Sequence, residues 1–157
     1  METIDPRDLE LLKELIRCLN SRPRLSVEER ELKFKRYFRN VFTRMTEHAT
    51  TYGEASGGPG MAPYSADINQ FNASLRSIDN NLREQLRIVT EGVEHYFCNG
   101  EYPPPYYAWR IAVILRKSKL LALELAFLEA FYAKFFDGAG KRYDEIGERI
   151  EKLRNLF

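Results

Sequence analysis

The chain contains few of the residues on which catalysis, metal binding and covalent cross-linking depend. Its 157 residues include two cysteines, Cys18 and Cys98, and two histidines, His48 and His95. Cysteines so far apart supply neither the ligand pairs of a zinc site nor a disulfide framework, so we expect two reduced thiols, no metal site and no cofactor. The scarcity of histidine leaves few forms that a histidine-based active site could take.

The chain also lacks an excess of charge and a long apolar run. Lys and Arg number 24 against 23 Asp and Glu, which gives a net charge of +1 and no global reason to expect a nucleic-acid or membrane-surface protein. No run of about 18 apolar residues is present, and the N-terminal residues do not have the pattern of a signal peptide. We therefore expect a soluble, cytoplasmic protein that meets no membrane and meets any charged partner through a local patch.

What the chain does have is apolar residues at steps of three and four, the spacing of amphipathic helices. The spacing predicts helices over 6–20, 26–52 and 68–97, two helices over 106–136 that turn near Ser118, and a last helix from Tyr143 to Leu156. One continuous helix over 106–136 is the alternative. With no strand-like alternation, we expect an all-α fold, a single domain over 1–157 built as an antiparallel bundle of about six helices.

The helices over 26–52 and 68–97 are the longest, and we expect them to pair antiparallel at the centre of the bundle. Ser26 followed by Glu29 has the form of a capping box, which predicts where the first of them begins. Its apolar seam is mostly aromatic, so we expect these rings in the core: Phe34, Tyr37, Phe38, Val41, Phe42, Met45, Ala49 and Tyr52. Four glycines and two prolines between 53 and 64 predict a flexible loop.

Three prolines at 103–105 lead into a segment with Tyr106, Trp109 and small residues such as Ala112, then an Arg116-Lys117 turn and a second run carrying Glu124. This segment of about thirty residues resembles a single tetratricopeptide-type helical hairpin. It departs from that family at Glu124, where a small residue is usual, and no second copy is present. A lone hairpin cannot form the stacked binding groove of such repeats. The resemblance therefore implies a packing motif first, and a role in protein interaction only by analogy with the family.

Neither histidine stands in a pattern typical of catalysis. Glu91 and His95 are four residues apart on one helical face, and Glu47 and His48 could approach them if the two long helices pair. A di-metal centre needs a three-residue Glu-to-His spacing from two helices, which is absent. No Ser-His-Asp or Cys-His arrangement is evident either, so we name no catalytic residue and expect a protein that is not an enzyme.

Two groups of side chains have the composition of binding surfaces. The first is rich in the residue types that anchor interfaces, and we predict a partner-binding surface at Tyr102, Tyr106, Trp109, Arg116 and Lys117. The second lies in a basic run over 30–44, where six positive residues stand against Glu31 alone. There Lys33, Arg36 and Arg39 are candidates for contact with phosphates or an acidic partner.

These features favour an interaction protein whose partner is another protein. A nucleic-acid-binding accessory subunit that uses the basic face and aromatic cluster is the alternative. A nuclease-like enzyme centred on His48 or His95 is a third hypothesis, with less in its favour. The long apolar seams also fit a homo-oligomer.

Overall fold

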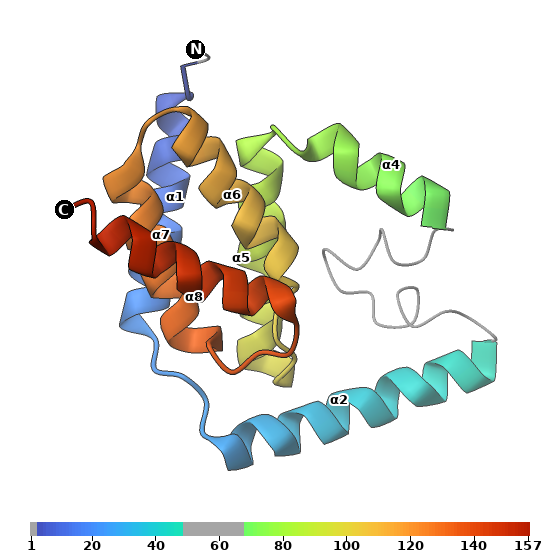
Figure 1. Ribbon diagram of the computed structural model, residues 1–157. Coiled ribbons are helices and arrows are strands. Elements are labelled where there is room, and N and C mark those ends of the chain that lie inside the picture. The colour runs from blue at the N-terminus through green and yellow to red at the C-terminus, as the bar shows by residue number, and fades with distance from the viewer. Residues whose placement is uncertain (1–2, 49–67) are drawn as a thin grey trace. The chain divides into compact units, whose positions relative to one another are not determined.

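The computed structural model describes residues 3–48 and 68–157 of the chain, and these are all-helical (Figure 1). Helices account for 80% of the described residues, none of which forms a strand, so the predicted all-α fold is confirmed. The described helices are α1 (Pro6–Ser21), α2 (Val27–His48), α4 (Ile68–Ile78), α5 (Leu82–Asn99), α6 (Pro105–Lys117), α7 (Leu121–Phe135) and α8 (Lys141–Arg154). The flexible loop predicted over 53–64, with Ala49 and Tyr52, lies outside the described residues.

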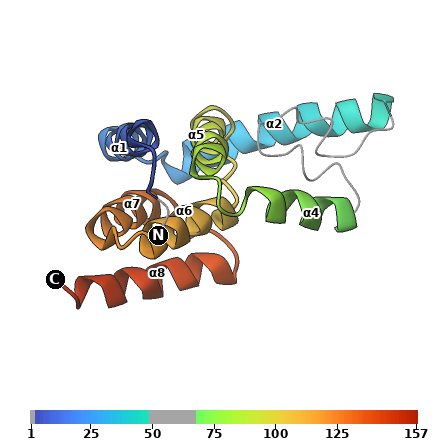
Figure 2. The ribbon, with the colours of Figure 1, turned by 90° about the horizontal axis from the view of Figure 1, so that it is seen from above.

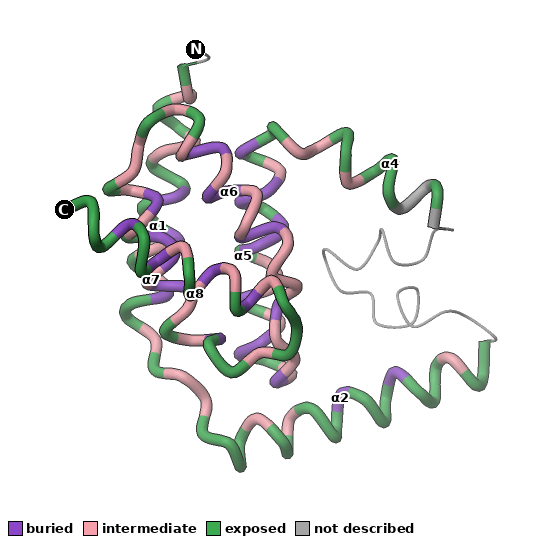
Figure 3. The backbone as a smooth tube through the Cα atoms, in the orientation of Figure 1, coloured by how far each residue is buried: buried purple, intermediate pink, exposed green. Residues whose placement is uncertain are grey.

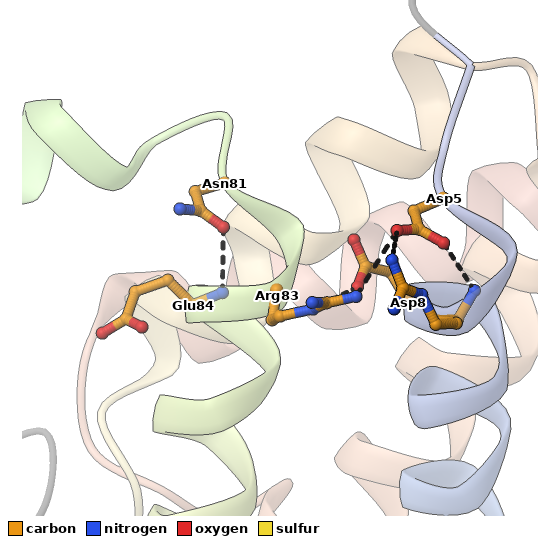
Figure 4. Close-up of polar contacts among 6 residues, drawn as sticks. Asp5, Asp8, Asn81, Arg83 and Glu84 are labelled. Carbon is orange, nitrogen blue, oxygen red and sulfur yellow. Dashed lines mark hydrogen bonds and ion pairs between the residues drawn. The ribbon is translucent and has the colours of Figure 1, made fainter.

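The prediction of one continuous helix over 68–97 is wrong, because the chain leaves the helix between Ile78 and Leu82. Asn81 caps the new helix: its side-chain oxygen accepts a hydrogen bond from the backbone N–H of Glu84 at 3.1 Å (Figure 4). Asp and Asn compete with the helix for backbone hydrogen bonds, which is why they favour caps and turns. The run Asp79-Asn80-Asn81 therefore divides the predicted helix into two, α4 and α5. The described residues form seven helices, one more than predicted.

The described contacts divide the chain into two compact units. Unit 1 contains residues 1–24, 80–86 and 104–157, and unit 2 contains residues 25–79 and 87–103. Neither unit is a continuous stretch, and α5 has residues in both. The expectation of a single domain stays a prediction.

Unit 1 is a layered helical bundle. Figure 2 shows α6 and α7 lying between α1 on one side and α8 on the other, and close contacts join α1 to α7, α6 to α7, and α8 to both. The apolar face predicted for α1 is buried at Leu12, Leu15 and Leu19. α7 supplies most of the aromatic core, whose largest fully buried side chains there are Phe127, Phe131 and Phe135.

The start of α1 is tied to the start of α5 within unit 1. Asp5 caps α1 by accepting a hydrogen bond from the backbone N–H of Arg7 at 2.9 Å, and this bond holds the pKa of Asp5 below its ordinary value. The guanidinium of Arg83 donates to Asp8 at 2.7 Å and to Asp5 at 3.5 Å (Figure 4). The predicted start of the first helix at residue 6 is confirmed.

A tight turn joins α6 to α7, which confirms two helices rather than one. The backbone N–H of Leu120 donates to the carbonyl of Leu115 at 2.9 Å, and that of Lys119 donates to Arg116 at 3.0 Å. This pair of bonds is the Schellman motif, in which the residue directly after the helix C-cap has a left-handed backbone conformation. Lys119 has a φ of 59° and occupies the position that glycine usually takes.

Unit 2 is organised around the contact of α2 with the C-terminal end of α5. The predicted start of α2 at Ser26 is confirmed, with one half of the capping box formed: the Ser26 hydroxyl accepts from the backbone N–H of Glu29 at 3.1 Å, and it donates to the Glu29 carboxylate at 3.0 Å. Tyr37 and Val41 are buried, with Met45 packed against them. Gly100 has a φ of 74°, and a Cβ there would lie 2.4 Å from the carbonyl oxygen of Arg30, so only glycine allows this approach of α2.

Candidate functional site

Trp109 of the predicted aromatic surface is half-buried and held by arginines of its own chain. Arg116 lies seven residues further along α6, on the same face, with its guanidinium carbon 5.4 Å from the centre of the Trp109 ring. Arg142 of α8 lies 5.2 Å from the same ring. Each cation–π contact contributes about 0.5 to 1 kcal/mol to stability. Trp109 and Arg116 are thus brought together, and they join α6 to α8.

Arg116 also belongs to a buried ion cluster in unit 1. Glu124 of α7 is fully buried, and its Oε1 accepts hydrogen bonds from Arg116 Nη2 at 3.0 Å and from Arg149 Nε at 2.9 Å. Arg149 Nη2 donates to the other carboxylate oxygen at 3.0 Å, which makes the Arg149 pair bidentate. One carboxylate therefore links α6, α7 and α8. Sequence reasoning missed Arg149, which no local pattern connects with Glu124.

The remaining residues of the predicted aromatic surface lie in different settings. Tyr102 belongs to unit 2, where its ring is 5.4 Å from that of Tyr96 and 4.6 Å from the guanidinium carbon of Arg30. Tyr106 is half-buried on α6, with Tyr107 edge-on at 5.6 Å. Lys117, at the end of α6, is exposed. Of the five predicted residues, four are partly buried and only Lys117 is exposed.

The predicted basic residues of α2 differ in their availability. Lys33 donates from its ammonium to the backbone carbonyl of Phe97 at 2.8 Å, which helps fix α2 to the end of α5. Arg36 and Arg39 are exposed. A basic face is therefore present on α2, with one of its three predicted members already engaged within unit 2.

The prediction that the α2 aromatic seam lies entirely in the core is wrong. Phe34, Phe38 and Phe42 are 38%, 47% and 59% exposed, while Tyr37 and Val41 on the same helix are buried. Figure 3 shows α2 as exposed over most of its length, with short buried stretches between. The ring centres are 6.0 Å apart for the first pair and 6.4 Å for the second, with the rings inclined by 27° and 25°. Phe34, Phe38 and Phe42 form a continuous aromatic stripe, because residues four apart share one helical face.

The basic residues beside Phe34 and Phe38 could have indicated from the sequence that this stripe is exposed, but the apolar spacing alone predicted burial. The α2 seam is wider than one packing partner can cover, and its exposed edge carries Lys35 and Arg39, one residue after Phe34 and Phe38 respectively. Basic residues that border an apolar arc mark the side of the helix that faces solvent.

The two histidines are not brought together. His95 is half-buried on α5, with the ring of Tyr37 edge-on at 4.8 Å and the Asn99 amide 3.2 Å from its Nδ1. His48 is exposed at the end of α2, about 16 Å further along the helix than Tyr37. Glu91 pairs with Arg87 at 2.6 Å. The described part of the chain holds no group of three or more side chains that could bind a metal ion.

Burial lowers the pKa of His95, and the carboxylate of Glu101, 3.9 Å from Nε2, opposes that shift without cancelling it. The imidazole is therefore neutral at neutral pH. Its contacts with Tyr37 and Asn99 are those of a packed side chain.

The pKa of His95 predicts a loss of stability in weak acid. The unfolded chain binds a proton at His95 near the ordinary pKa of about 6.5, and the folded chain binds it only at lower pH, so the free energy of unfolding falls as pH drops below about 6.5. We expect His95→Gln to flatten this dependence when urea unfolding is followed between about pH 7.5 and pH 5.5, above the range in which carboxylates titrate. His48→Gln is the matched control and should keep the dependence. An unchanged slope in His95→Gln would contradict the assignment.

The hairpin expected from the tetratricopeptide resemblance is present as α6 and α7. No protein-family model, curated protein or solved structure matches this chain. The resemblance itself stays a prediction. None of the described helices combines the length and the apolar character needed to cross a membrane.

Proposed function

We propose that this protein is a non-enzymatic adaptor of the cytoplasm that binds a protein partner through the aromatic stripe of α2. The observation that carries the proposal is the exposure of three stacked phenylalanines on one helix. Contiguous exposed apolar surface rimmed by charge is typical of interaction sites, and aromatic side chains supply much of the binding energy in interfaces. The free thiols of Cys18 and Cys98 suit a reducing compartment.

The side chains predicted at the first surface have a smaller part in this proposal. Trp109 and Arg116 are engaged with Arg142 and Glu124, so a partner could use them only by breaking contacts within unit 1. Lys117 is exposed and is the member best placed to add a charge contact. A partner could bind the α2 stripe without breaking contacts of this kind.

A nucleic-acid partner is the second candidate, and the exposure of Arg36 and Arg39 favours it. These arginines are three residues apart on α2 and could contact successive phosphates. In that case single-stranded RNA would be retained at low salt, and retention would be lost in Arg36→Glu/Arg39→Glu. No retention at low salt would discard this candidate.

Photo-crosslinking from α2 tests the proposed protein partner. The chain carries benzoylphenylalanine in place of Phe42, or in place of the exposed Asn40 as a matched control on the opposite side of the helix. On illumination in an extract of the native cells, we expect a protein adduct from position 42 and none from position 40. Absence of an adduct at 42, equal adducts at both positions, or an adduct that nuclease removes would contradict the proposal.

A further inference from the structure

We propose that the segment bound by the α2 stripe is an acidic amphipathic helix, an inference that rests on the proposed function and names the chemistry of the partner. Phe34, Phe38 and Phe42 lie one turn apart and span about 12 Å along α2. A stripe of this length matches the apolar residues that a second helix presents at steps of three and four over three turns.

Two positive side chains line the open edge of the stripe alongside its three rings, and Glu31 stands one turn before Lys35, beyond the start of the stripe. Lys35 follows Phe34 and precedes Phe38 by three residues, and Arg39 stands in the same relation to Phe38 and Phe42. Both basic side chains are exposed, and they are four residues apart on one line of the helix. Between residues 32 and 46 the sequence contains no Asp or Glu. A partner with carboxylates along one edge of its apolar face would pair with this line, whereas a basic partner would be repelled.

The opposite edge of the stripe is covered by the contact of α2 with the C-terminal end of α5. Tyr37 and Val41 are buried, and Lys33 on that side is bonded to Phe97. A partner therefore meets basic residues along one edge only, which fits a helix laid beside α2. Two α2 helices from separate copies would place like charges against each other, and this disfavours a second copy as the occupant.

The arrangement of the rings does not favour nucleic acid on the stripe. Single-stranded bases bind aromatic side chains by stacking on a free ring face. Phe38 lies 6.0 Å from Phe34 and 6.4 Å from Phe42, so a base could stack against the middle ring only by separating it from one of its neighbours. An apolar helix face needs no such gap.

Two synthetic peptides test the chemistry of the partner against the full chain. Each peptide has about 18 residues, with leucines on one helical face and alanines and polar residues elsewhere. All polar positions are glutamate in one peptide and glutamine in the other. In fluorescence anisotropy titrations at about 50 mM salt we expect the glutamate peptide to bind about tenfold more tightly, with the preference lost near 0.5 M salt. Lys35→Glu/Arg39→Glu should abolish the preference, and Phe38→Ala/Phe42→Ala should weaken both peptides about tenfold or more.

Matched controls lie on the same helix. Leu32 is 62% exposed and outside the stripe, and Asn40 is exposed on the side of the helix opposite Phe42. Leu32→Ala and Asn40→Glu should leave both affinities unchanged, and circular dichroism confirms that every variant is folded.

Equal affinity for the two peptides, binding of neither, or a glutamate preference that survives Lys35→Glu/Arg39→Glu would overturn the inference. So would sedimentation of the chain with vesicles of anionic phospholipid that is lost in Phe38→Ala/Phe42→Ala, since the stripe would then face a lipid surface. These results leave the crosslinking experiment untouched. A protein adduct at position 42 together with a failed peptide titration would keep the proposed function and reject the acidic helix.

Discussion

Replacing Glu124 with alanine should lower the free energy of unfolding by about 3 to 5 kcal/mol, because removing one member of a buried ion cluster leaves its partners uncompensated. Glu124 is fully buried, and its two arginine partners are only 34% and 18% exposed at the side chain. Urea unfolding followed by circular dichroism measures the loss. Glu124→Gln should cost less than Glu124→Ala, since the amide keeps the volume and one hydrogen-bond acceptor.

Glu129 provides the matched control on α7. Its carboxylate is 3.4 Å from Arg154, but the two side chains are 42% and 54% exposed. Exposed pairs of this kind contribute about 0 to 1 kcal/mol, so Glu129→Ala should be nearly neutral. Similar losses in Glu124→Ala and Glu129→Ala would show that the buried cluster does not hold α6, α7 and α8 together.

Gly100→Ala should lower the free energy of unfolding by about 2 to 4 kcal/mol, as the sum of backbone strain and overpacking. The strain arises from the φ of 74°, which disfavours a residue with a Cβ. The overpacking arises because the new Cβ would lie 2.4 Å from the carbonyl oxygen of Arg30, in the backbone of α2, which cannot move as a side chain can. Hydrogen exchange should also be faster at the α2 amides, where the contact with α5 is broken.

Substitution of Gly140 is the control that distinguishes the cost of backbone strain from the cost of overpacking. Its φ is 117°, also unfavourable for alanine, but a Cβ there would meet nothing within 4 Å. Gly140→Ala should therefore show the cost of strain alone, about 1 to 3 kcal/mol, without faster exchange in α2. Unchanged α2 exchange in Gly100→Ala would contradict the role of Gly100 in seating that helix.

The helical elements could be predicted because their signals are local. Ser26 and Glu29 identify the start of α2, and the leucines of α1 and the isoleucines of α8 are buried as their spacing predicts. The break before α5 was missed because the apolar spacing continues across it. Asn81 carried the opposing signal, a preference for capping, and in the structure that preference outweighs periodicity.

Tertiary burial could not be predicted in the same way. The sequence places Phe38 and Val41 on one broad apolar arc, yet one is exposed and the other is buried, because only part of the arc meets a neighbouring helix. The resemblance to a tetratricopeptide hairpin drew attention to Glu124 as an exception. The explanation for that exception comes from Arg149, a residue of the next helix that no repeat pattern indicates.

The interleaved connectivity of the two units governs how the newborn chain can fold. α1 ends at Ser21 and leaves the ribosome well before α7, against which its leucines pack and which begins only at Leu121. Contacts between segments so distant in sequence form late and slowly. Until α7 has been synthesised, the apolar face of α1 therefore has no packing partner in α7 and can be bound by chaperones.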